Sequence, residues 1–472
     1  MDGATPLRIE PLALPVPSRR LVGARLAQAF SAAARHLSRR PWRSSPAARW
    51  AAVVRPVFDD MGGTFTKFGQ LVASSPGLFG AEVAAEFRGC LDAGPPVPFD
   101  QVRATVEGEL GGRMGDLFST FEQEPVAAAS LAVVHRATLP DGTPVAVKIL
   151  RPGIEARIAT DLAVMGPLFR FIGRQIAVGT AGALPGLADG LAVQVAEELD
   201  LTNEARALSW AQEVIDLLGV TEIVVPQPVA ARSSRRVLTM SFIEGVPIDD
   251  PAAIAALGVE PASLVRACVM VWFAGLLATG VFHGDIHAGN MFVTPDGRLA
   301  MLDWGIVGRL DPATAKFFRR CLEAVLGDEP AWLDVAAHVE QMYGSQIREP
   351  LGLTEEQWVT FVRLQVEPLF VTPFGQVDLR TMLMGEGTLD TAREGAPSPD
   401  RRRGLEWWRY WRLERRRVLA VLDSEGFGGE FDRVTFLLGK QLIYFERYGK
   451  LFMPDTPLLY DPDAFRALLS QA

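Results

Sequence analysis

The sequence is short of cysteine, short of lysine and without a long apolar run, and each shortage narrows what the protein can be. Three of its 472 residues are cysteines, Cys90, Cys268 and Cys321, which lie far apart and form no Cys-x-x-Cys pair. This pattern argues against disulfide bonds and against a structural zinc site. It is typical of a reducing compartment, so we expect a cytoplasmic location.

No stretch of the chain reaches the run of about 18 apolar residues that a membrane-spanning helix requires. The nearest candidate, residues 267–282, is shorter and leads directly into a polar loop, which is typical of a buried helix. The amino terminus also lacks the basic start, apolar centre and small-residue cleavage site of a secretory signal. The sequence therefore predicts neither a spanning segment nor a secretory signal.

Lysine is the scarcest charged residue, because only five of the 47 basic residues are lysines. A chain that otherwise uses arginine is expected to keep lysine where a compact ammonium is needed and a planar guanidinium does not serve. The five are Lys67, Lys148, Lys316, Lys440 and Lys450. Two of them, Lys67 and Lys148, fall in motifs described below.

Length and composition predict a globular protein of two or three domains, since 472 residues are too many for one small core. Hydrophobic residues make up 49% of the chain and charged residues 22%, which excludes a largely disordered protein.

Charge is divided unevenly along the chain. Residues 1–55 hold ten arginines against Asp2 and Glu10, a balance of +8, so the remainder carries −17 to give the net charge of −9. This basic leader either lies on an anionic membrane, in peripheral contact with its inner face, or is a solvated, partly disordered arm. Nucleic acid is not an expected partner, because the rest of the chain is acidic and contains no basic–aromatic module.

The most informative feature is a loop whose spacing is that of a kinase active site. Asp285 is followed five residues later by Asn290, and Asp303 follows thirteen residues after that. Phosphoryl transfer needs a carboxylate beside the attacking hydroxyl, together with Asn and Asp oxygens that hold Mg²⁺ on the phosphates. The alternative is an ordinary polar loop between strands, but three correctly spaced residues between predicted strands favour the catalytic interpretation.

A second element of such a site is a lysine at the end of a strand. Residues 145–150 form the second strand of a predicted hairpin and contain Val-Ala-Val-Lys, in which Lys148 can reach the α- and β-phosphates. Its carboxylate partner is expected on the helical segment 193–208, where Glu198, Asp200 and Glu204 are candidates. Acidic residues on a helix are more often a solvated face, so the choice among them stays open. Backbone groups around Met240 and Phe242 are predicted to bind the adenine edge.

Taken together, these residues resemble the UbiB/AarF family of unorthodox protein-kinase-like proteins, whose known members support isoprenoid quinone biosynthesis. The resemblance covers residues 50–310 and, more weakly, the chain up to residue 451. The segment from Lys67 to Gln70 matches the family's KxGQ motif, which ordinary kinases lack. Glu198 and Asp200 match its ExD motif. An alanine-rich segment stands where kinases have a glycine-rich loop, and its residues are Ala127, Ala128, Ala129 and Ser130.

The resemblance implies an ATP- and Mg²⁺-binding site capped by its own chain. Lys67 and Gln70 would cover the nucleotide, with Lys67 paired to Glu198. Glu204 would pair with Lys148. The sequence departs from the family pattern at Val133, Ala288 and Ser241, none of which is a metal ligand or the phosphate-binding lysine.

The expected fold class is α+β, with a two-lobed protein-kinase-like fold, an amino-terminal helical extension and a largely helical carboxy-terminal lobe. We expect four regions: the basic leader (1–45), the helical extension carrying KxGQ (46–115), the small lobe with a helical insertion (116–245) and the large lobe (246–472). A tryptophan–arginine segment at 405–417 is either an interfacial helix or a lobe helix with inward-facing aromatics.

Three functions are compatible with these patterns. The first is an ATPase, or a kinase acting on a small or lipid-like molecule, that supports isoprenoid quinone lipid metabolism. Protein phosphorylation is disfavoured, because six residues (306–311) between Gly305 and the next helical pattern leave no room for an activation segment. The second is a non-catalytic, nucleotide-gated protein that binds a lipid or a partner. The third, an antibiotic- or choline-kinase-like phosphotransferase, has no use for KxGQ or ExD.

Overall fold

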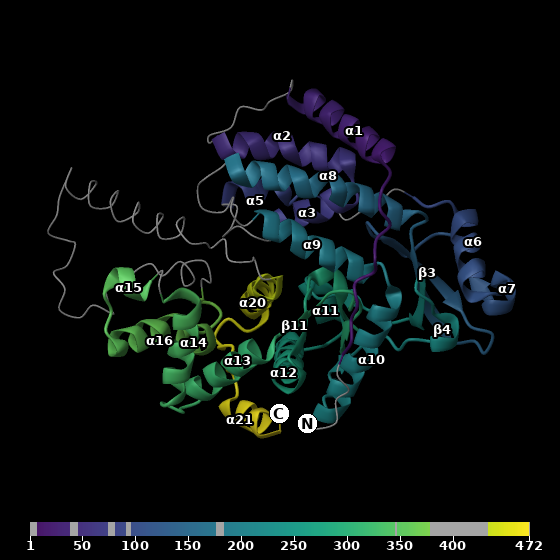
Figure 1. Ribbon diagram of the computed structural model, residues 1–472. Helices are drawn as coiled ribbons and strands as arrows, with labels where there is room; N and C mark the ends of the chain where they lie inside the picture. The colour runs from purple at the N-terminus through teal and green to yellow at the C-terminus, as the bar shows by residue number, and fades with distance from the viewer. Residues whose placement is uncertain are drawn as a thin grey trace.

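The computed structural model describes residues 7–37, 46–73, 81–90, 96–175, 184–344, 347–377 and 433–471, and it confirms the mixed α+β class. A small lobe built on an antiparallel sheet lies beside a mostly helical large lobe, and a layer of helices covers the small lobe (Figure 1). The tryptophan–arginine segment at 405–417 lies outside the described residues.

The small lobe is organised by five antiparallel strands in the order β1-β3-β4-β6, with β2 pairing to the free part of β3. The bounds are β1 (Thr120–Phe121), β2 (Ala127–Ala128), β3 (Ala132–Thr138), β4 (Pro144–Leu150) and β6 (Val237–Ser241). The central strand β4 is buried on both faces, as its near-continuous apolar run Val-Ala-Val-Lys-Ile-Leu predicts. Lys148 is the one charged residue in that run, so its surroundings are a candidate binding site.

Helices α6 (Phe99–Leu110) and α7 (Met114–Leu117) cover one face of this sheet. Val102 and Val106 of α6 share an apolar cluster with Val133 and Val147 of the strands. The apolar side of α6, which the sequence groups with the helical extension up to residue 115, is buried against β4 and β6.

Three helices connect β4 to β6, in the region where the sequence predicts a helical insertion. They are α8 (Ile154–Gln175), α9 (Leu184–Glu198) and α10 (Leu201–Leu218). Asp200 separates the last two: its backbone is extended, and its side chain caps α10 by accepting a hydrogen bond from the Thr202 N–H. The two helices therefore leave this point in different directions.

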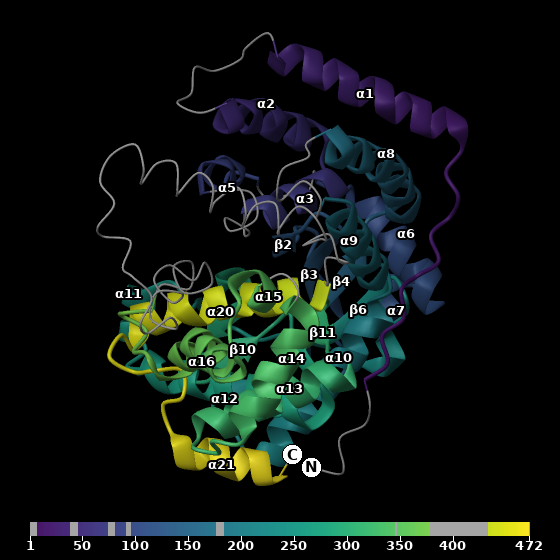
Figure 2. The ribbon, with the colours of Figure 1, turned by 60° about the vertical axis from the view of Figure 1, so that its left-hand side comes forward.

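The amino-terminal helices are α1 (Arg19–Leu37), α2 (Pro46–Met61), α3 (Thr64–Ala73) and α5 (Ala81–Phe87). They pack on one another and on α8, with α1 outermost in both views (Figures 1 and 2). Phe58 lies at the centre of this layer, with its ring in edge-on contact with Phe65, Phe68 and Phe87 at centroid distances of 5.6–6.1 Å.

The described part of the basic leader packs against the rest of the protein and is not a solvated arm. Residues 7–18 run in extended form along the α9–α10 junction. There the Leu12 N–H donates to the Ala196 carbonyl at 2.9 Å, and the Asn203 side-chain amide donates to the Glu10 carbonyl at 2.9 Å. Hydrogen bonds to buried backbone groups hold this segment in place, and the composition of the segment could not predict them.

The large lobe is built around α12 (Pro261–Thr279), whose Trp272 contacts Phe282 and Phe445 edge-on at 5.4 Å. Within the described residues, α12 is the single helix long and apolar enough to cross a membrane, and 67% of its apolar stretch is buried inside the protein. Short strands beside it are β5 (Ile223–Val224), β7 (Val246–Pro247), β8 (Val281–His283), β9 (Met291–Val293), β10 (Leu299–Met301) and β11 (Val307–Arg309). The remaining helices are α11 (Pro251–Ala256), α13 (Pro312–Val325), α14 (Ala331–Tyr343), α15 (Arg348–Leu351), α16 (Glu355–Val371), α20 (Arg433–Phe452) and α21 (Pro462–Gln471).

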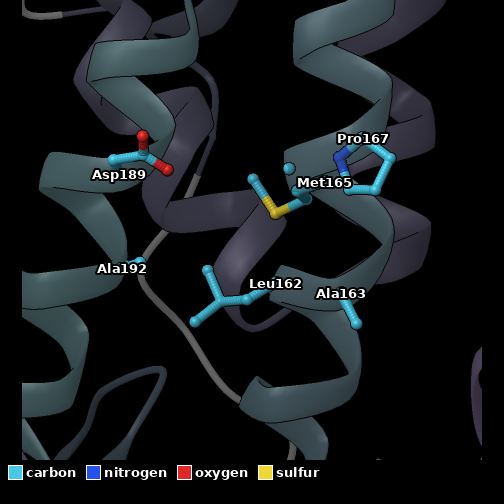
Figure 3. A pocket seen from close by; sticks show the side chains of 7 residues that line it. Leu162, Ala163, Met165, Pro167, Asp189 and Ala192 are labelled. Carbon is cyan, nitrogen blue, oxygen red and sulfur yellow. The ribbon is translucent and has the colours of Figure 1, made fainter.

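A cavity of about 210 Å³ lies between α8 and α9 (Figure 3). Leu162, Met165 and Pro167 of α8 line it, together with Asp189 and Ala192 of α9. None of the residues predicted to bind nucleotide is part of its lining.

Candidate active site

The structure brings Lys148, Glu204 and Asp303 together from three separate elements. The Lys148 ammonium, on β4, donates to Glu204 Oε1 at 2.8 Å and to Asp303 Oδ2 at 3.1 Å. Glu204 lies in the first turn of α10, and Asp303 follows β10. Of the three candidate acids, Glu204 is therefore the partner of the strand lysine.

Burial and charge act against each other in this cluster. Burial raises the pKa of Glu204 to about 7, although the Lys148 ammonium favours its charged form. Burial alone would also raise the pKa of Asp303, but Lys148 and the Gly305 N–H, which donates to Asp303 Oδ1 at 2.9 Å, hold it well below its usual range. Asp303 thus stays a carboxylate, the form that a metal ion requires.

The predicted catalytic loop is held in place by its own polar groups. The Asp285 N–H donates to His283 Nδ1 at 2.9 Å, and the Asn290 side-chain amide donates to the Asp285 carbonyl at 3.2 Å. Burial lowers the pKa of His283 to about 4, so its ring is neutral and can accept that bond. The ring packs edge-on against Trp304 with 4.4 Å between centroids, which ties the Asp285 loop to the segment that carries Asp303.

The donor set fits Mg²⁺. Because Asn290 donates its amide nitrogen to the backbone of Asp285, its amide oxygen is turned away from that bond and can serve as a ligand. The Asp303 side chain is 42% exposed, so its oxygens can be reached from solvent. One amide oxygen and one carboxylate, completed by phosphate oxygens and water, are a usual environment for Mg²⁺ in phosphoryl transfer.

The KxGQ segment forms α3 and covers this cluster. Lys67 makes an ion pair with Glu198, and Gln194 donates to the other oxygen of Glu198 at 3.2 Å. A Cβ atom on Gly69 would lie 2.7 Å from the sulfur of Cys90, so glycine at this position lets α3 approach the segment after α5. Gln70 lies one turn after Lys67 on the same helix, as the motif predicts.

The alanine-rich segment makes a tight hairpin. Ala127 and Ala128 form β2, the Ala129 N–H donates to the Ala132 carbonyl at 2.9 Å, and Ser130 is buried at the turn. Arg151 donates to the Ala129 carbonyl at 2.9 Å. The hairpin has the place expected of a phosphate-covering loop at the edge of the sheet, and its contact with phosphates stays a prediction.

The backbone of Met240 and Phe242 is partly used in strand pairing, and its contact with adenine stays a prediction. Met240 lies inside β6, in register with Ala146, and the N–H groups of Ser241 and Phe242 donate to the carbonyls of Gln227 and Pro144 at 2.9 and 3.2 Å. These two N–H donors are used within the protein. One carboxylate oxygen of Asp200 caps α10 and accepts from the Thr202 hydroxyl at 2.7 Å, and a role of Asp200 in nucleotide binding stays a prediction.

Sequence reasoning missed one residue of the site. Lys440, on α20, makes an ion pair of 2.6 Å with Asp285 Oδ1. Burial alone would raise the pKa of Asp285, but the Lys440 ammonium, together with the neighbouring His287 and His283, keeps the pKa below its usual value. The scarcity of lysine was a signal that could have found it.

Comparisons with known proteins identify one family of kinase-like proteins. Residues 90–332 match the model of the ABC1 atypical kinase-like domain, a range that contains Lys148, Glu204, Asp285 and Asp303. The chain is 32% identical to an uncharacterized aarF domain-containing protein kinase of Arabidopsis thaliana, named as chloroplastic, over 86% of this chain and 73% of that protein. It is 34% identical to an uncharacterized protein of Mycobacterium tuberculosis, over 96% of this chain and 85% of that one. It is 31% identical to a probable protein kinase UbiB of Azotobacter vinelandii, over 72% of this chain and 64% of that protein.

Proposed function

This chain belongs to the family of ABC1 atypical kinase-like proteins, and we propose that it binds ATP with Mg²⁺ and either hydrolyses it or phosphorylates a small or lipid-like molecule. The observation that carries this proposal is the convergence of Lys148, Glu204 and Asp303 beside the Asp285 loop. A strand lysine paired with a helix glutamate, beside an aspartate that can hold Mg²⁺, is the arrangement that kinases use to orient phosphates.

Each residue has a part in the proposed reaction. Lys148 orients the α- and β-phosphates, and Glu204 holds Lys148 in place. Asp303 and Asn290 hold Mg²⁺, which neutralises charge on the phosphates when it is bound. Asp285 orients the attacking water or hydroxyl and accepts its proton.

The acceptor that we propose is not a protein. Six residues separate Gly305 from the start of α13 at Pro312, and three of them form β11, which pairs with β8. This short connection contains no platform on which a peptide could lie. Several relatives are named UbiB, and the motifs resemble those of proteins that support quinone biosynthesis, so we propose a role in isoprenoid quinone lipid metabolism.

The proposal is tested by measuring ATP binding and hydrolysis on the purified full chain with Mg²⁺, with and without anionic liposomes and a quinone-precursor mimic. We expect Mg²⁺-dependent turnover. The absence of both MgATP binding and turnover under all of these conditions would reject it.

We further propose that α1 contacts an anionic membrane surface. Leu26, Phe30 and Leu37 lie at helical spacing on one side of α1 and are 39%, 73% and 48% exposed. The helix has no acidic residue, and Arg19 and Arg20 are exposed at its start. An exposed apolar side with basic flanks suits the headgroup region of anionic lipids.

Substituting Phe30 with aspartate is therefore expected to weaken binding to anionic vesicles by about tenfold, or about 1.4 kcal/mol. The change removes an apolar anchor and adds a charge that anionic lipids repel. Vesicle co-sedimentation measures the effect. Leu333→Asp is the matched control, because Leu333 is 55% exposed on α14 and should leave binding unchanged. Equal losses in the two variants would argue against a membrane contact by α1.

A nucleotide-gated binding protein without catalysis is the alternative, and the covered site favours it. Lys67 and Glu198 close α3 over the cluster, and such a cover can transmit nucleotide binding to a partner surface. A choline-kinase-like phosphotransferase is a third candidate, and its activity would not require the pair of Lys67 and Glu198.

Lys67→Ala separates the third candidate from the others. It leaves the half-buried Glu198 carboxylate without this ammonium, beside the phosphate site, so the affinity for MgATP is expected to fall by about tenfold. Isothermal titration measures it, with Lys316→Ala on the exposed side of α13 as the control. An unchanged affinity in Lys67→Ala would favour the phosphotransferase.

A further inference from the structure

Three of the five lysines of the chain meet the four carboxylates of the site. Lys148 binds Glu204 and Asp303, Lys67 pairs with Glu198, and Lys440 pairs with Asp285. They come from β4, α3 and α20, three elements far apart in the sequence. The first two follow from known motifs, whereas Lys440 belongs to none of the motifs identified in the sequence and lies outside the range 90–332 matched by the family model.

We propose that Lys440 is a positioning residue that holds the Asp285 carboxylate for catalysis, and that α20 braces the catalytic loop against the cover formed by α3. This inference rests on the proposed function only for its effect on turnover. The pairing of Lys440 with Asp285 is a property of the fold and can be tested without a reaction.

The contact is built into the helix and is not a loose surface pair. Lys440 and Asp285 are each 15% exposed, and the Asp285 N–H is fixed by His283. Two turns after Lys440, the buried Tyr448 hydroxyl donates to the Ile286 carbonyl at 3.0 Å. The same side of α20 thus contacts two successive residues of the catalytic loop, Asp285 and Ile286. The contact of Phe445 with Trp272 packs α20 against the core helix α12.

The amino-terminal end of α20 contacts α9, the helix whose Glu198 binds Lys67 of α3. Arg433 Nη2 lies 2.7 Å from Glu197 Oε2, and Arg309 binds the other oxygen of this buried carboxylate. Glu197 is the neighbour of Glu198, the partner of Lys67. Seven residues of helix, about 10 Å, therefore separate a contact beside the cover from the contact with Asp285.

Holding Asp285 in this way affects the chemical step more than the binding of nucleotide. The ammonium keeps the carboxylate charged and in one orientation, which is what a group that orients a nucleophile requires. Lys148 and the metal ligands, which bind the phosphates, do not contact Lys440 in the described structure. A residue that acted only on stability would not lower the rate of the chemical step while leaving nucleotide affinity unchanged.

The test compares Lys440→Gln with Lys450→Gln, which lies on the same helix, is 44% exposed and pairs with Glu446. We expect Lys440→Gln to lower kcat for MgATP by about 10- to 100-fold, with Kd for MgATP changed by less than about twofold. Lys440→Arg, which keeps the charge, should regain part of kcat and provides a second variant if the glutamine variant does not fold. An unchanged kcat, or equal losses in kcat and affinity, would overturn the proposal.

A double-mutant cycle separates this inference from the proposed function. Asp285→Asn, Lys440→Gln and the double variant are compared in their denaturant midpoints. If the two side chains are coupled, the double variant loses less than the sum of the single losses. If the wild type shows no turnover but the coupling is present, the proposed function fails and the pairing stands. Additive losses would overturn the pairing whatever the activity.

Discussion

Replacing Asp285 with asparagine is expected to lower MgATP turnover by roughly 100- to 10,000-fold while MgATP still binds, because a positioned general base contributes about that much. Asparagine keeps the shape of the side chain and removes the proton acceptor. The loop that carries it is fixed independently, through His283 and Asn290, so the nucleotide-binding groups stay in place. Steady-state turnover and isothermal titration with MgATP measure the two quantities separately.

Asp303→Asn provides the contrast, since it should lower both turnover and MgATP affinity. The change removes the negative charge of the proposed metal ligand and one of the two carboxylates that bind Lys148. Asp296→Asn is the control, because this exposed aspartate bonds only its neighbours Thr294 and Arg298 in the turn after β9. If Asp285→Asn and Asp303→Asn lose affinity equally, the roles assigned to the two aspartates are wrong. If Asp285→Asn retains both binding and function in cells, the non-catalytic regulator is the better description.

The acidic residues near Asp200 show which part of the site the sequence could predict and which part depends on the fold. Spacing alone identified Glu198, Asp200 and Glu204 as candidates without assigning their partners, whereas the family resemblance implied the pairs of Lys67 with Glu198 and of Lys148 with Glu204. The structure separates them because Asp200 has an extended backbone (φ −122°) and starts a new helix. Glu198 ends α9 and faces Lys67, whereas Glu204 lies on the first turn of α10 and faces Lys148.

The contacts that sequence reasoning missed depend on tertiary packing without a local signal. Lys440 follows Asp285 by 155 positions, and no spacing rule connects residues so far apart. The extended leader segment is held mostly by backbone carbonyls and amides, which every residue has. Residue type likewise could not show how much of the Met240 and Phe242 backbone is used in strand pairing, because the neighbouring strands decide that.

Replacing Arg25 with alanine is expected to destabilise the protein by about 3–5 kcal/mol, the cost of leaving a buried charge without its partner. Arg25 Nε binds Asp161 Oδ1 at 2.6 Å, and the Asp161 side chain is fully buried. Burial raises the pKa of Asp161, and the Arg25 guanidinium opposes this by favouring the charged form. Denaturant unfolding measures the loss, with Arg35→Ala as the control: its pair with Asp60 is exposed and should contribute less than about 1 kcal/mol.

The same arginine connects the outer helix to the cover of the active site. Arg25 Nη2 also donates at 2.7 Å to the carbonyl of Met61, the last residue of α2. There the chain turns through Gly62 and Gly63, both with positive φ, into α3 and Lys67. Removing both charges, as Arg25→Ala with Asp161→Leu, should restore much of the stability, since the buried Asp161 carboxylate is then removed together with its Arg25 partner. The Met61 carbonyl would keep only the bond from Arg157 Nη2 at 3.1 Å and lose that from Arg25, so MgATP affinity should remain lowered in the double variant. Full recovery of both properties would mean that α1 does not position α3.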